Sequence, residues 1–173
     1  MINSKSIFKA FCSLLVAGAL CLSLTSNSQA QSAKNAVYLE LAGNGALYTL
    51  NYDRMVTDNV SVRAGSMFMS LDAADEQGSA SAGLLIAPLM GNYFIGDGSH
   101  KFELGAGPAI VNASASTDFG TFDESGTFLF GTATAGYRFQ PNDGGFVFRI
   151  GFTPLFGSTG FLPWAGLSLG YSF

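Results

Sequence analysis

The chain has few of the residues from which most catalytic and metal sites are built. It contains one histidine, His100, and two cysteines, Cys12 and Cys21, and both cysteines lie within the first thirty residues. Without that segment, the chain has no thiol for a disulfide, a thiolate metal site or a cysteine nucleophile. We therefore expect no bound metal and no cofactor.

Charged residues are scarce, and basic ones are the scarcer kind. Only 12% of the chain is charged, and beyond residue 30 it has six Lys and Arg against twelve Asp and Glu. Nucleic-acid-binding domains need a basic patch to neutralise phosphates. The charge balance thus argues against a nucleic-acid partner.

Long apolar runs are absent after residue 30, so no segment there is expected to span a membrane as a helix, which takes about 20 residues. The one long run, 11–24, follows Lys5 and Lys9 and precedes the small-residue sequence Ser28–Gln29–Ala30. A basic, then apolar, then small-residue order is typical of a cleaved secretory signal peptide. We expect residues 1–30 to be a signal peptide and residues 31–173 to form one domain.

Glycine and aromatic residues are abundant, and large apolar side chains alternate with small or polar ones. Side chains of a strand point alternately to its two faces. The clearest example is the last ten residues, in which Leu167, Leu169, Tyr171 and Phe173 share one face and Gly166, Ser168, Gly170 and Ser172 share the other. This pattern predicts a strand with one apolar and one narrow, polar face.

The same alternation predicts eight strands, as in membrane-spanning β-barrels. Gly43–Asn44–Gly45 is expected to be a tight turn between the first two strands, whereas 70–81 and 113–125 are expected to be polar loops. Pro88 indicates a local distortion, because proline cannot donate to a strand ladder, and Pro108 lies near the far end of its predicted strand. The predicted strands are 36–42, 46–55, 60–70, 82–94, 101–112, 127–140, 146–155 and 164–173.

Four stretches carry a resemblance to a known family: Val37–Gly45, Leu50–Arg54, Phe102–Gly107 and Pro163–Phe173. Through them the chain resembles the small eight-stranded outer-membrane barrels of the OmpA/OmpX type, and more closely a widespread group of bacterial outer-membrane β-barrel proteins. The resemblance implies an all-β, antiparallel, up-and-down transmembrane β-barrel with periplasmic termini. It also implies a monomer surrounded by outer-membrane lipid and lipopolysaccharide.

In that family, the barrel-assembly machinery reads a C-terminal strand that ends in Phe. The resemblance therefore gives the role of an insertion signal to Leu167, Leu169, Tyr171 and Phe173.

A barrel in hydrocarbon must close, because each unpaired backbone group there costs several kcal/mol. An eight-stranded lumen is just wide enough to be filled by side chains. Opposite charges inside it can pair, which favours a plugged lumen over an open pore, and inward glycines are expected to make room for the arginine stems. The charged residues that the alternation places inward are Glu40, Asp53, Arg63, Glu103, Arg138 and Arg149.

The two polar loops contain most of the remaining acidic residues. Their carboxylates are suitable ligands for a divalent cation or a partner, although their spacing matches no calcium-binding loop. The simpler interpretation is that they keep exposed loops solvated. These residues are Asp72, Asp75, Glu76, Asp118, Asp123 and Glu124.

Three functional classes stay open. A structural or surface-interaction role is favoured, and a small transporter or channel is the alternative. A lipid-modifying enzyme is disfavoured, because outer-membrane enzymes of this kind rely on a histidine near the outer leaflet, whereas His100 lies in a predicted periplasmic turn beside Ser99 and Asp97. A soluble lipocalin-like barrel would show the same alternation, but with its arginines in water.

Overall fold

The computed structural model describes residues 33–75, 78–117, 122–157 and 160–173. The predicted signal peptide, 1–30, lies outside the described residues. None of the described residues forms a helix long and apolar enough to cross a membrane. The elements are β1 (Asn35–Ala42), the 3₁₀ turn η1 (Gly43–Gly45), β2 (Tyr48–Met55), β3 (Val60–Asp75), β4 (Gly78–Ile95), β5 (His100–Thr117), β6 (Phe122–Phe139), β7 (Gly145–Phe152), β8 (Leu155–Gly157), β9 (Gly160–Leu162) and β10 (Ala165–Ser172).

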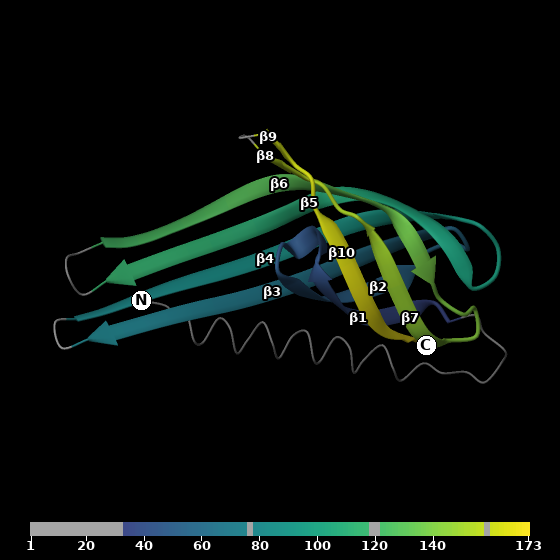
Figure 1. The fold of residues 1–173 in the computed structure, drawn as a ribbon, viewed down its shortest axis with the longest axis horizontal. Coiled ribbons are helices and arrows are strands. Elements are labelled where there is room, and N and C mark those ends of the chain that lie inside the picture. The colour runs from purple at the N-terminus through teal and green to yellow at the C-terminus, as the bar shows by residue number, and fades with distance from the viewer. Residues whose placement is uncertain (1–32, 76–77, 118–121, 158–159) are drawn as a thin grey trace. The chain divides into compact units, whose positions relative to one another are not determined.

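Eight of these strands form a closed antiparallel barrel (Figure 1). β1 to β7 pair in sequence, β10 pairs with β7, and β1 pairs with β10 in the register Val37↔Tyr171. Closure leaves no free edge within the barrel, as a sheet in hydrocarbon requires. The predicted eight-stranded up-and-down barrel is confirmed.

The two faces of the barrel differ as the alternation predicts. Outward residues such as Leu39, Leu169 and Tyr171 are about half exposed, whereas the inward Arg63 and Arg138 are buried. A soluble lipocalin-like barrel would show the reverse distribution, with apolar residues inside and arginines in water.

The strands are less uniform than predicted. β1, β2, β7 and β10 have 8 residues each, whereas β3 has 16 and β4, β5 and β6 have 18 each. The two polar loops expected at 70–81 and 113–125 are therefore wrong: both stretches are mostly strand, and they extend the β3–β4 and β5–β6 hairpins well beyond the other strands (Figure 1). Serine, threonine and alanine at these positions lower the hydropathy but do not prevent backbone pairing.

Proline shapes two strands differently. β4 continues through Pro88, and its pairing with β3 skips from Leu89 to Ile86 without a change of register. Pro154 ends the predicted strand 146–155 early, because proline has no N–H for the ladder. β7 stops at Phe152, and the chain resumes as the short hairpin β8–β9, whose first strand pairs with β6.

Candidate functional site

Six charged side chains inside the barrel form one chain of alternating sign. Each comes from a different strand, and only β4 and β10 of the eight barrel strands contribute none. All six are at least 95% buried at the side chain. In order, with nitrogen–oxygen distances, the chain runs Arg63–Glu40 (3.6 Å), Glu40–Arg149 (3.3 Å), Arg149–Glu103 (2.6 Å), Glu103–Arg138 (3.6 Å) and Arg138–Asp53 (2.6 Å).

The bond between Arg149 and Glu103 is bidentate. Arg149 donates Nε–H to Glu103 Oε2 at 2.8 Å and Nη2–H to Oε1 at 2.6 Å, and its Nη1 reaches Ser168 Oγ on β10 at 3.1 Å. Parallel bonds of this kind are among the strongest that a carboxylate makes. They fix the centre of the charge chain.

Tyr38, which the sequence analysis did not single out, contacts two arginines. The Arg149 guanidinium carbon is 4.7 Å from the centre of its ring and that of Arg138 is 5.6 Å away. The Tyr38 hydroxyl lies 3.4 Å from both Asp53 Oδ2 and Arg63 Nη1. The ring thus attracts two guanidinium groups through its π system.

The turn between β1 and β2 folds into the barrel instead of standing on its rim. Asn44 in η1 is fully buried. It donates to Thr132 Oγ1 at 2.6 Å and to the Ala133 carbonyl at 2.9 Å, and it accepts bonds from Arg63 Nη2 and Thr134 Oγ1. The expected tight hairpin turn is therefore a cap that joins β1–β2 to β6, with Ala42 and Ala46 at positive φ on either side.

Near the Asp53 end of the charge chain, Arg138 packs over an aromatic ring. The Arg138 guanidinium carbon lies 4.9 Å from the centre of the Phe94 ring, and Arg138 Nε donates to Gln140 Oε1 at 2.8 Å. Phe94, like Tyr38 and Asn44, was missed by the sequence analysis, because β4 is apolar on both faces and its alternation carries little signal.

We expected the inward glycines to make room for the arginine stems, but they do not. A Cβ at Gly170 would lie 2.3 Å from the Tyr38 Cβ, and one at Gly166 would lie 2.8 Å from the Gly43 Cα. The space is used by the tyrosine and by the inserted turn. Glycine is needed there because neighbouring strands and η1 approach closely.

The charged groups border a small cavity. One cavity of about 10 Å³ lies among Glu40, Glu103, Arg149, Thr134 and Ser168, which is the volume that one water molecule needs. Within the described part of the chain, no three His, Cys, Asp or Glu residues are grouped to hold a metal ion.

The remaining predicted residues lie away from this cluster. The four residues of the expected insertion signal are exposed on the outer face, and the Phe173 backbone pairs with Asn35. Of the six acidic residues assigned to loops, Asp72 is exposed on β3. The side chains of the other five, Asp75, Glu76, Asp118, Asp123 and Glu124, lie outside the described residues.

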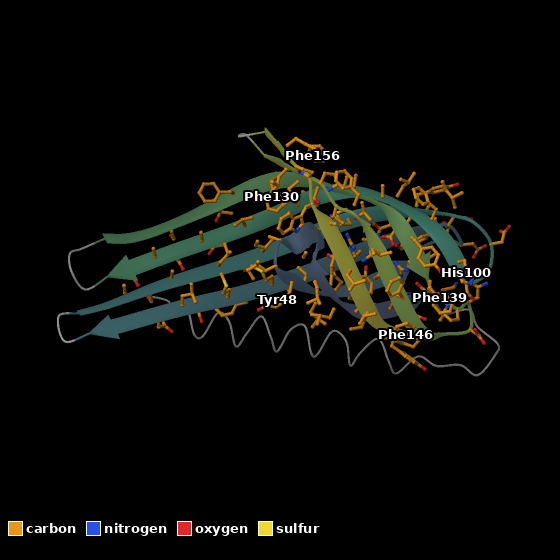
Figure 2. All side chains as sticks on the ribbon, in the orientation of Figure 1. Tyr48, His100, Phe130, Phe139, Phe146 and Phe156 are labelled. Carbon is orange, nitrogen blue, oxygen red and sulfur yellow. The ribbon has the colours of Figure 1, made fainter. Side chains whose placement is uncertain are left out.

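His100 does not form a relay with its neighbours in sequence. Its Nδ1 is 2.6 Å from the Tyr137 hydroxyl, and its ring centre is 5.2 Å from that of Phe139. Figure 2 shows His100 and Phe139 together at the end of the barrel opposite the long hairpins. The Ser99 carbonyl accepts the Gln140 N–H.

Comparison with known proteins identifies the fold. No protein-family profile matches the chain, and no curated protein matches it by sequence. Among solved structures, the N-terminal β-barrel domain of Pseudomonas aeruginosa OprF aligns with a TM-score of 0.55 at 17% identity, over 81% of this chain and 96% of that domain. Ail, the attachment invasion locus protein of Yersinia pestis, crystallised with the heparin analogue sucrose octasulfate, aligns with a TM-score of 0.55 at 15% identity, over 82% and 97%. The chain therefore has the fold of the small eight-stranded outer-membrane β-barrels.

Proposed function

We propose that this protein is a monomeric, integral outer-membrane β-barrel whose lumen is closed by its own side chains, and that it has a structural and surface-interaction role. The observation that carries the proposal is the buried chain of six charges that joins six strands across the lumen. Such a network occupies the path that an ion would take. It also cross-links six of the barrel strands from the inside.

The outer surface supports the membrane assignment. Outward side chains are apolar along β3 from Val60 to Phe68, apart from Ser66, and on β10 they include Leu167, Leu169 and Tyr171. A tilted strand needs about 9–11 residues to cross the hydrocarbon, which matches this length. Exposed leucine and aromatic side chains around a closed barrel are stable in lipid and costly in water.

The lengths of the connections support an orientation. Both described termini and the short turns after β2, β4 and β6 lie at one end of the barrel, and the long β3–β4 and β5–β6 hairpins project from the other. Outer-membrane barrels have short periplasmic turns and longer outer loops. We place the termini in the periplasm, residues 1–30 as a cleaved signal peptide and β10 as the strand read by the assembly machinery.

Two features distinguish the proposed role from its alternatives. The single histidine is bonded to Tyr137 and lies at the proposed periplasmic end, which does not suit an enzyme acting on lipopolysaccharide in the outer leaflet. Ail was crystallised with a polysulfated ligand. Here residues 64–100 and 102–137 contain no Lys or Arg, so we propose that this barrel does not bind polysulfates.

Planar-bilayer recording tests the closed lumen. The purified, folded protein should give no stable conductance steps, while a general porin reconstituted in the same bilayer serves as the positive control. Folding is checked by heat-modifiable gel mobility on the same sample. Reproducible single-channel steps from the folded barrel would show that the lumen conducts and would favour the transporter alternative.

A further inference from the structure

Beyond the barrel, the four long strands form a sheet whose two faces have exchanged their polarity. The pairings run across four strands, for example Ser70↔Gly83, Gly83↔Ser114 and Ser114↔Ser125. We call residues 69–72 of β3, 80–84 of β4, 111–116 of β5 and 125–128 of β6, with the pairings between them, the outer sheet. In the barrel the outward face is apolar and the inward face polar, and in the outer sheet this is reversed.

The outward face of the outer sheet is polar. Ser81 and Ser116 are exposed and their hydroxyls lie 2.7 Å apart, and Asn112 donates to Thr127 Oγ1 at 3.0 Å. Asp72 is on the same face, opposite Ser81. The lipid-facing apolar belt therefore ends below this level, and the outer sheet stands in water.

The inward face of the outer sheet is apolar. It continues upward from a small core cluster of Met67, Ile86 and Ala109, against which Leu84 and Val111 pack. Farther along the strands the cover ends: Leu71 and Phe128 are each 63% exposed. The small residues between them, such as Ala82 and Ala115, are also exposed.

An exposed apolar sheet face in water indicates a binding surface. The charge of the chain around this face indicates which class of partner suits it. In the sequence, the two stretches that include the long hairpins, 69–84 and 111–128, contain six acidic residues and no Lys or Arg. Elsewhere the charges nearly balance, since three acids face three arginines in the lumen.

We propose that the inward apolar face of the outer sheet binds a cationic, amphipathic protein segment, whose apolar side chains cover Leu71, Leu84 and Phe128 while its basic side chains meet the acidic hairpins. Complementary charge favours this occupant over a second copy of the chain, because two copies would bring two groups of carboxylates together. The proposal rests on the proposed surface-interaction role and gives that role a partner class.

The test uses the full mature barrel in nanodiscs of zwitterionic phospholipid, which carry no net charge that would attract the probe. The probe is a fluorescein-labelled 14-residue amphipathic peptide of leucine and lysine, and a peptide with glutamate in place of lysine is its control. Fluorescence anisotropy should show saturable binding of the lysine peptide, and rising salt should weaken it. The glutamate peptide should not bind.

Two matched variants separate the apolar face from simple charge attraction. L71S with F128S should weaken binding by about tenfold or more, because it removes the exposed apolar contacts. N112A with T127A alters only the opposite face and should bind as the parent does. D72N also lies on the opposite face, but it removes a negative charge that acts at a distance. It should lower the salt dependence of binding and weaken binding much less than L71S with F128S does.

Failure of this inference is distinct from failure of the proposed function. A protein without heat-modifiable mobility in lipid would contradict the membrane barrel itself. If the barrel folds but L71S with F128S binds the peptide as tightly as the parent, the attraction is electrostatic only and the docking face is wrong. Concentration-dependent dimers that L71S with F128S abolishes would assign the face to a second copy instead.

Discussion

Arg149 on β7 and Glu103 on β5 are joined inside the lumen by two parallel hydrogen bonds, at 2.6 Å and 2.8 Å, although β6 lies between their strands in the sheet. The pair therefore connects two strands that do not pair with each other, by passing over β6. It is also the centre of the charge chain, because Arg149 continues to Glu40 and Glu103 continues to Arg138. Removing either partner leaves a buried charge in a site that contains space for only about one water.

We predict that Arg149→Leu destabilises the barrel by about 3–5 kcal/mol, because Glu103 loses its bidentate partner without access to solvent. The measurement is the urea midpoint of unfolding in lipid, followed by heat-modifiable gel mobility. Arg54→Leu is the matched control: Arg54 is exposed and bonds only to Asn35 Oδ1, and it should change stability by less than about 1 kcal/mol.

The double variant R149L/E103L distinguishes pairing from packing. It should be more stable than R149L alone, since it no longer buries a carboxylate that has lost its bidentate partner. E103L alone gives the effect of the second substitution. If the free energies of unfolding lost in R149L and in E103L simply add in the double variant, the two residues do not act as a pair.

Asn44→Ala should lower the free energy of unfolding by about 1–3 kcal/mol. The substitution removes the oxygen that accepts bonds from Arg63 and Thr134 and the N–H group that donates to Thr132, and all three partners are buried. The same urea titration measures the loss. Asn112→Ala is the comparison, since Asn112 is exposed on the outer sheet and makes one side-chain bond, to Thr127. Equal effects for the two variants would show that the η1 turn does not hold the lumen together.

Gly170→Ala should destabilise the barrel by about 1–3 kcal/mol through overpacking. A methyl group there would lie 2.1 Å from the Val37 carbonyl oxygen and 2.3 Å from the Tyr38 Cβ, and the backbone oxygen cannot move aside cheaply. Gly91→Ala is the control, because a methyl group at Gly91 has nothing within 4 Å. A Gly170→Ala barrel as stable as the parent would mean that β1 and β10 are farther apart than described.

The sequence was sufficient to predict which side chains of each barrel strand face inward and that the sheet closes into a barrel. Alternation places a residue such as Arg63 or Leu169 inside or outside from its parity alone, and hydrocarbon forbids an open edge. Parity does not fix the stagger between strands, so it could not predict that Arg149 meets Glu103 and not Asp53. That pairing depends on the shear of the whole barrel.

The errors at the two expected loops and at Asn44 have a common cause, which is that polarity was taken as a sign of a loop. Ser114 and Ser116 pair along a regular strand because their backbone groups bond whatever the side chains are. Asn44 was assigned to a tight turn between strands, since Gly–Asn–Gly is a good turn sequence. Asn44 inserts into the lumen because it bonds Arg63 and Thr134 there. Both residues are distant from Asn44 in the sequence, so a local pattern does not reveal them.

We predict that Phe173→Ala lowers the amount of folded protein in the outer membrane in vivo, because the proposed insertion signal loses its aromatic side chain. Refolding of the purified variant in detergent should be nearly unchanged, since the bonds of Phe173 to Asn35 are made by its backbone. Phe146→Ala is the matched control, because Phe146 is a similarly exposed aromatic on the neighbouring strand β7, opposite Tyr171. Equal loss for both variants in vivo would contradict a specific role of Phe173.

The depth of the barrel in the membrane can be tested with one arginine at two heights. Leu169 lies outward in the middle of β10, paired with Leu39 and Phe148, whereas Ser114 lies on the outward face of the outer sheet. Leu169→Arg should cost about 2–4 kcal/mol in lipid, because it brings a charge near the midplane, and Ser114→Arg should cost at most about 1 kcal/mol. Both costs come from urea titrations of refolding into phospholipid vesicles. The same two variants in detergent micelles should differ much less, since a micelle deforms around a charge. If Ser114→Arg is as costly as Leu169→Arg in vesicles, the hydrocarbon reaches the outer sheet, and its polar outward face would then need a partner instead of water.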